Sequence, residues 1–285
     1  MSVAHCPEAS SVLADAEILS AARALNLAAG GGGQAKLMSR LFSRDLSLDE
    51  LTRLITAEPA LAMRTLRVAN SAFYQRCGEV GTVDRAVQVL GLACVKGIAA
   101  AACMDRTVRS HTGLASAEAA RLRRHSIAVA CAAQALARHL LPLQEAEAMM
   151  AGMLHDVGML VLWALRPQQM AGQAGGSAEL IGHHEHCGQL VMQAWQLPGW
   201  LQQVVALHHR GALPEDTTGT LCLITRVAEA LSERMGYGLA AEAGEIGDDD
   251  LEPAGSTLGM DEAALAKLAE ALPEQIDQFN SALSA

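Results

Sequence analysis

Residues 151–158 read Ala-Gly-Met-Leu-His-Asp-Val-Gly, and they place His155 and Asp156 side by side between two apolar runs. The surrounding spacing predicts a buried helix over Leu143–Leu165. A buried carboxylate is costly unless a partner compensates its charge, and a divalent cation would satisfy both side chains at once. Imidazole suits Zn, Fe or Mn, and a neighbouring carboxylate favours Mn or Fe. This segment therefore predicts a metal site inside a helical core.

The rest of the chain favours an all-α fold. It has 285 residues, of which 51% are hydrophobic and only 3% are aromatic, so Ala, Leu and Val supply the apolar content. This composition excludes a disordered chain and argues against an all-β protein. The apolar spacing and the capping residues predict helices over Ser10–Leu27, Ser47–Ile55, Pro59–Asn70, Thr82–Gly91, Leu92–Met104, Ala117–Leu141, Leu143–Leu165, Ser177–Trp195, Pro198–His209, Thr217–Met235 and Asp261–Leu283, the last interrupted at Pro273.

Changes in composition along the chain suggest four parts. We expect an N-terminal helix with a tetraglycine linker over residues 1–35 and a first helical subdomain over 36–110. A polar junction, Asp105–Ser116, separates that subdomain from a second one, which covers residues 111–236. Residues 237–285 form an acidic tail that carries the terminal helix.

Charge and cysteine content limit the classes of partner. The net charge is −10, yet residues 1–240 hold 20 basic and 20 acidic residues, while 241–285 hold 11 acidic residues and only Lys267. A neutral body without a basic stripe argues against nucleic-acid binding. The apolar run Ala86–Met104 contains Gln88 and Lys96, which favours a buried helix pair over a membrane span. Seven cysteines without a C-x-x-C pair, and no evident signal peptide, predict reduced thiols in the cytoplasm.

Histidines are concentrated in the second half of the chain. Eight of the ten lie between His125 and His209. Combined with the His155–Asp156 pair, this crowding favours a common polar centre over scattered surface residues. Two interpretations remain open: a working metal site, or a polar cluster held only by mutual hydrogen bonds.

The order of these motifs resembles the HDOD family (HD-related output domain) of bacterial signalling proteins, within the HD phosphohydrolase superfamily. The resemblance covers about residues 36–234. It rests on separated segments in the expected order: Leu54-Ile55, Glu58-Pro59-Ala60-Leu61, Leu66, Ala69-Asn70-Ser71-Ala72-Phe73-Tyr74, Ala86-Val87, Leu90-Gly91, Arg124-His125-Ser126, the segment 151–158, and Trp195-Gln196-Leu197-Pro198 leading to His208-His209.

The resemblance implies two helical subdomains, the second an HD-like bundle, and a set of metal-ligand positions. His184 is assigned to the third histidine position, with His183 and His186 as weaker competitors. Glu229 stands where the superfamily usually has a late aspartate, and this is the weakest assignment. The full implied set, for one or two divalent ions, is His125, His155, Asp156, His184, His208, His209 and Glu229.

For function, the resemblance implies a regulatory output module that acts through contacts with a signalling protein. The alternative is a metal-dependent phosphohydrolase that acts on a nucleotide or cyclic dinucleotide, with Asp156 as its key residue. Against that alternative, Gly158-Met159 stands where the cyclic-dinucleotide phosphodiesterases have Gly-Lys, and no Gly-Tyr-Pro follows His209. A receptor that binds a nucleotide in the same pocket without turnover is a second alternative. Arg121, Arg123 and Arg124 could hold a phosphate near the metal, or form a solvated helix face.

Overall fold

The computed structural model describes residues 13–28, 40–41, 43, 45–71, 74, 79–111, 116–171, 182–209, 211–239 and 255–284. Within these ranges every regular element is a helix, as predicted. The tetraglycine run, Gly30–Gly33, lies outside the described residues. The helices are α1 (Asp15–Ala28), α3 (Leu48–Thr56), α4 (Pro59–Ala69), α5 (Val83–His111), α6 (Ser116–Leu140), η2 (Pro142–Gln144), α7 (Glu145–Leu154), α8 (Val157–Leu165), α9 (Pro167–Ala171), α11 (His184–Ala194), α12 (Gly199–Leu207), α13 (Thr217–Arg234) and α15 (Glu262–Ser284).

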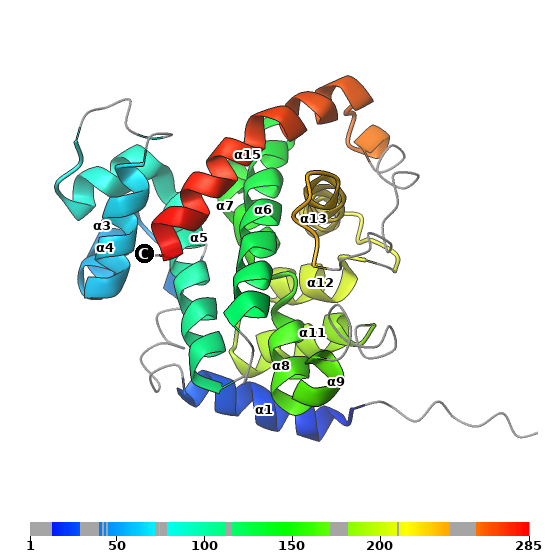
Figure 1. The fold of residues 1–285 in the computed structure, drawn as a ribbon. Coiled ribbons are helices and arrows are strands. Elements are labelled where there is room, and N and C mark those ends of the chain that lie inside the picture. The colour runs from blue at the N-terminus through cyan, green and yellow to red at the C-terminus, as the bar shows by residue number, and fades with distance from the viewer. Residues whose placement is uncertain are drawn as a thin grey trace, which may run out of the picture.

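Two groups of helices make up the molecule. In Figure 1, α3 and α4 lie on one side with the first part of α5, and the larger bundle of α6, α7, α8, α11, α12 and α13 occupies the other. The second half of α5 packs against α7 and joins the groups. Helix α1 runs below the larger bundle against α11 and α8, and α15 crosses α6 and reaches α4. The N-terminal and C-terminal helices thus both pack on the larger bundle.

Local signals in the sequence explain several helix ends. The Ser47 side chain accepts a hydrogen bond from the Glu50 amide and begins α3, and Pro59 lies in the first turn of α4. Gly91 has φ 75° and breaks the long α5 where a helix end was predicted. Asn70 ends α4, and its side-chain amide bonds both the N–H and the C=O of Val80, at 2.8 Å each. These predictions of helix boundaries are confirmed.

Other boundaries differ from the prediction. The predicted helix Leu143–Leu165 is broken at His155 and Asp156 into α7 and α8. The polar stretch expected to separate the subdomains is helical as far as His111, since α5 continues through it. Helix α15 continues through Pro273, although proline has no backbone N–H to donate within a helix. Helix α11 begins at His184, and residues 172–181 lie outside the described part.

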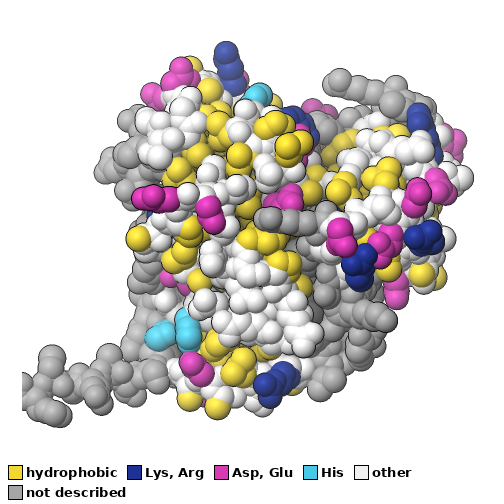
Figure 2. Space-filling model, turned by 180° about the vertical axis from the view of Figure 1, so that it is seen from behind, with side chains coloured by type: hydrophobic (Ala, Val, Ile, Leu, Met, Phe, Trp, Pro, Cys, Tyr) yellow, Lys and Arg dark blue, Asp and Glu magenta, His cyan; other side chains and the backbone are white. Residues whose placement is uncertain are grey.

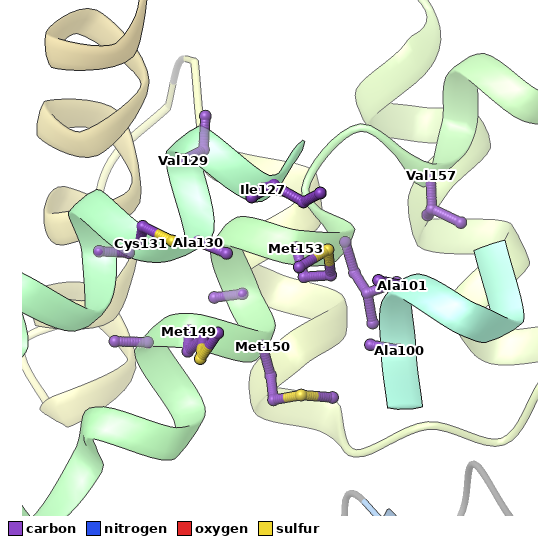
Figure 3. Close-up of a cluster of buried hydrophobic side chains, with 14 of the residues drawn as sticks. Ala100, Ala101, Ile127, Val129, Ala130, Cys131, Met149, Met150, Met153 and Val157 are labelled. Carbon is purple, nitrogen blue, oxygen red and sulfur yellow. The ribbon is translucent and has the colours of Figure 1, made fainter. Parts of the chain in front are cut away.

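The core of the larger bundle is filled by small and flexible apolar side chains. Figure 3 shows Met149, Met150 and Met153 of α7 packed among alanine, valine and isoleucine from α5 and α6. All three methionines are about 1% exposed. Because alanine lets helices approach closely and methionine fills irregular gaps, this core forms with few aromatic residues.

Two segments, Val83–Ala102 and Pro142–Leu165, are long and apolar enough to pass a simple test for membrane spans. However, 67% and 89% of these apolar stretches are buried inside the protein, as expected of core helices. On the face shown in Figure 2, basic and acidic side chains are scattered among apolar ones, and neither sign covers that face.

Candidate metal centre

The turn between α7 and α8 carries the two central side chains. His155 follows the last residue of α7, and Asp156, with φ −94° and ψ 16°, precedes the first residue of α8. The two side chains at this break reach the same point, and His155 Nε2 lies 3.4 Å from Asp156 Oδ2. A continuous helix would have separated them by about 100° around its axis.

The Asp156 carboxylate lies at the centre of the cluster. Its Oδ2 is 3.4 Å from Nε2 of His125 on α6 and 3.4 Å from Nε2 of His155. Its Oδ1 is 3.4 Å from Nε2 of His184 on α11 and 3.7 Å from Nε2 of His208, which follows α12. Each carboxylate oxygen therefore faces a different pair of imidazoles.

Three imidazoles are held from behind by backbone carbonyl groups. Nδ1 of His125 bonds the Tyr237 carbonyl at 2.9 Å, Nδ1 of His155 bonds Gly152 at 2.8 Å, and Nδ1 of His208 bonds Val205 at 2.7 Å. A carbonyl oxygen only accepts, so each Nδ1 carries the hydrogen, and a neutral ring then presents a lone pair at Nε2. All three lone pairs point toward Asp156.

These lone pairs make the cluster fit a cation. Nε2 of His125 and Nε2 of His155 are 3.1 Å apart, and two neutral rings that carry their hydrogen on Nδ1 would have no hydrogen to place between them. A proton or a metal ion at the centre relieves this repulsion. Outer carbonyl groups that fix the tautomer of an imidazole are typical of metal-ligating histidines.

All seven residues that the sequence assigned to the metal lie in or beside this centre. They form two overlapping groups of ligand atoms, and the atoms of each group lie within 4.8 Å of one another. Oε1 of Glu229 on α13 is 3.8 Å from His155 Nε2 and 3.6 Å from His209 Nε2, so it lies between the groups. One group is Asp156, His184, His208 and His209, and the other is His155, Asp156, His208 and Glu229, with His125 against it.

Burial and charge set the protonation of the centre. Burial lowers the pKa of His208 to about 4. Burial, together with the neighbouring His208 and His184, lowers the pKa of His209 to about 2. Burial opposes the charge on His125, but the hydrogen bond and the charge of Asp156 outweigh it and raise the pKa of His125. Burial likewise opposes the charge on Asp156, yet His155 and His125 hold its pKa well below the ordinary value. The centre therefore keeps an anionic carboxylate beside the neutral rings of His208 and His209, which suits a cation.

Two glycines of the opening segment allow the helices to approach closely enough. A Cβ at Gly152 would lie 2.7 Å from the Val129 carbonyl oxygen, so α7 rests directly on α6, which carries His125. A Cβ at Gly158 would collide with the His184 carbonyl, so α8 rests directly on α11. Both contacts bring a ligand of one helix toward Asp156.

Other histidines and arginines point elsewhere. Nε2 of His186 lies 2.8 Å from Asp15 Oδ1 on α1 and is exposed, and His183 precedes α11, so His184 alone of the three reaches the centre. Arg124 pairs with Asp277 of α15 at 3.1 Å and lies over the Tyr237 ring. Arg123 bonds Asn280 of the same helix, and Arg121 bonds the Leu239 carbonyl.

Some residues near the centre carried no signal in the sequence. Glu185 accepts a hydrogen bond from the His209 amide at 3.2 Å, and Arg226 binds the carbonyl of Leu207, just before His208. The carbonyl groups behind the rings belong to residues of any type, so no pattern of side chains could have indicated them.

Comparisons with known proteins agree with this geometry. The family model for the HDOD domain matches residues 34–211, more than half of the chain. This chain belongs to the HDOD family. No curated protein matches the chain.

Solved structures share the HDOD fold along almost the whole chain. An HDOD domain protein with unknown function from Geobacter sulfurreducens has a TM-score of 0.69 and 18% identity, and covers 93% of this chain and 97% of its own. A candidate phosphohydrolase from Shewanella amazonensis SB2B has a TM-score of 0.69 and 22% identity, over 94% and 98% of the two chains. A candidate signal transduction protein from Marinobacter aquaeolei VT8 has a TM-score of 0.67 and 19% identity, over 96% and 69%. At these identities the likeness concerns the fold.

Proposed function

We propose that this HDOD protein is a bacterial, cytoplasmic signal-transduction module that holds one or two divalent metal ions and acts through contacts with a signalling partner. The observation that supports metal binding is a set of three imidazoles. Their Nδ1 atoms donate to carbonyl groups, and their Nε2 atoms meet at Asp156. Membership of the HDOD family supports the signalling role.

Burial favours a regulatory ion over a catalytic one. His125, His155 and His208 are at most 1% exposed, and Asp156 is 3% exposed. A hydrolytic metal must also reach a water molecule and a phosphate oxygen of the substrate. Only His209 is partly accessible, with 14% of its side chain exposed. An ion held in this way would stabilise the junction of α6, α8, α11 and α13.

The donor set supports a choice among divalent ions. Five imidazoles with two carboxylates, and no thiolate among the residues of the two groups, suit Fe, Mn or Zn. The mixed nitrogen and oxygen donors favour Mn or Fe over Zn.

The test is elemental analysis of the full chain purified without chelator, followed by thermal unfolding with and without EDTA. We expect bound metal, a lower melting temperature after chelation, and recovery when Mn²⁺ or Fe²⁺ is added back. Asp156→Asn should remove the metal and the effect of EDTA, while Asp49→Asn, exposed on α3, should change neither. Metal-free wild-type protein that also fails to respond to added Mn²⁺, Fe²⁺ or Zn²⁺ contradicts the proposal.

A second candidate is a metal-dependent phosphohydrolase acting on a nucleotide or cyclic dinucleotide. The observation in its favour is that the two oxygens of Asp156 face different groups, as a carboxylate bridging two ions would. Bound ions would lower the pKa of a coordinated water and supply a nucleophile. Against it, Met159 stands where the cyclic-dinucleotide phosphodiesterases have the lysine that could stabilise charge on phosphorus.

Turnover separates the two candidates. Protein loaded with Mn, Fe or Zn is incubated with a panel of nucleotides and cyclic dinucleotides, and product is measured. Turnover that Asp156→Asn abolishes supports the hydrolase. Thermal stabilisation by a nucleotide without product supports a receptor. If the nucleotides produce neither turnover nor stabilisation, the protein-binding module is the interpretation that remains.

A further inference from the structure

The turn that carries His208 and His209 is held by two charged side chains outside the ligand set. Helix α12 ends at Leu207, so the carbonyl groups of its last turn lack helical partners. Nε and Nη2 of Arg226 donate to the Leu207 carbonyl at 3.1 and 2.6 Å, and Nη2 also donates to the Gly211 carbonyl at 3.2 Å. The guanidinium thus connects the residues just before and just after the turn.

From the other side, Glu185 of α11 accepts the hydrogen bond of the His209 amide. Glu185 is 7% exposed and adjoins His184. The guanidinium binds carbonyl groups at the carboxyl end of α12, where the helix dipole favours a positive charge. The carboxylate accepts the amide hydrogen of the turn in a charge-assisted hydrogen bond.

Arg226 also shares a helix face with a candidate ligand. Arg226 and Glu229 are three residues apart on α13, so they point to the same side. Helix α13 thereby directs Glu229 toward the centre and Arg226 toward the end of α12.

We propose that Arg226 is a positioning residue that fixes the His208–His209 turn and so determines how well the group of Asp156, His184, His208 and His209 binds a metal ion. The predicted effect of Arg226 on metal affinity rests on the proposed function, whereas its predicted effect on the positions of the His208 and His209 rings does not. Arginine suits this place because its planar fork reaches two carbonyl groups at once, which a lysine ammonium does less well.

The first measurement uses the full chain freed of metal by chelator. Long-range ¹H–¹⁵N NMR of the imidazoles reports the tautomer and surroundings of each ring. Arg226→Gln should shift the signals of His208 and His209 and leave those of His125 and His155 unchanged. The matched control, Arg234→Gln at the end of α13, should shift none of them. Unchanged His208 and His209 signals in Arg226→Gln, or equal shifts in all the rings with a general loss of stability, overturn the proposal.

The second measurement titrates the same proteins with Co²⁺ and follows its visible absorption. We expect Arg226→Gln to weaken binding about 10- to 100-fold, as removal of outer-layer partners does in metal sites. Arg226→Lys should recover part of the loss. Wild-type affinity in Arg226→Gln contradicts the proposal. If the wild-type protein binds no Co²⁺, Mn²⁺, Fe²⁺ or Zn²⁺, the proposed function fails, and the NMR comparison alone decides the role of Arg226.

Discussion

Gly158, at the start of α8, lies directly against the backbone carbonyl of His184, the first residue of α11. A Cβ at this position would collide with that carbonyl and lie 2.6 Å from the Gly188 amide nitrogen. The contact joins the helix that follows Asp156 to the helix that begins with His184. The close backbone packing at Gly158 therefore also brings Asp156 and His184 together in the candidate metal centre.

The substitution Gly158→Ala should separate α8 from α11. Because the obstacle is backbone, we expect a loss of about 3 kcal/mol in the free energy of unfolding, together with weaker metal binding. Urea denaturation and metal titration measure the two effects. The matched control is Gly199→Ala, where a Cβ meets no atom within 4 Å. Equal stability of the two variants would show that α8 can move without cost.

The metal-free protein should become less stable as the pH falls from 7 to 5. In the folded protein the pKa of His208 is about 4 and that of His209 is about 2. In the unfolded chain both side chains have a pKa of about 6.5. As the pH falls below 6.5, the unfolded chain therefore binds two protons that the folded protein does not bind. Each histidine contributes a loss on the order of 2 kcal/mol over this range. His125 acts in the opposite sense, since its raised pKa adds stability below pH 6.5, but two histidines with lowered pKa values act against this one.

Thermal unfolding at pH 7, 6 and 5 in chelator measures this pH dependence. His209→Asn should make the melting temperature fall less steeply, because one of the two buried neutral rings is gone. His139→Asn, on the exposed last turn of α6, should leave the slope as it is. A melting temperature that stays level or rises toward pH 5 would refute the assignment of neutral rings.

Asn70 should be important for the first group of helices. Its side chain bonds the Leu66 carbonyl and both backbone groups of the buried Val80. Asn70→Ala leaves both Val80 groups without this partner, while the Leu66 carbonyl keeps the bond from the Asn70 amide, and we expect a loss of about 2–3 kcal/mol in urea denaturation. Asn70→Asp keeps the acceptor for the Val80 amide but loses the donors, so its stability should be intermediate. Wild-type stability in Asn70→Ala would mean that water replaces the side chain.

Helix α15 should contribute to global stability. It buries Leu272, Ile276 and Phe279 against the bundle, and Phe279 is 1% exposed. Phe279→Ala should cost about 3–5 kcal/mol by leaving a cavity. Ser281→Ala, exposed on the same helix, should cost less than about 0.5 kcal/mol. If Phe279→Ala unfolds α15 alone in hydrogen exchange while the bundle keeps its stability, the helix is a separate unit.

The helices could be predicted because their signals are local. Ser47, Pro59 and Gly91 begin or break helices through contacts with their own backbone neighbours, so the helix boundaries that they cause can be recognised in the sequence. The break at His155–Asp156 was missed because both sides of it are equally apolar. At this break Asp156 contacts His125 and His184, which are distant in the sequence, and no local pattern indicates such contacts.

The sequence by itself determined the all-α class, the HDOD resemblance and the residue types from which a metal centre could be built. It also placed the polar side chains in an apolar setting, which requires them to find one another. Only the tertiary structure decided that one carboxylate would face four imidazoles, which nitrogen of each ring points inward, and that Arg226 and Glu185 would hold the last pair. These features depend on distances between helices far apart in the chain, and such distances are set by packing at Gly152 and Gly158 rather than by any local preference.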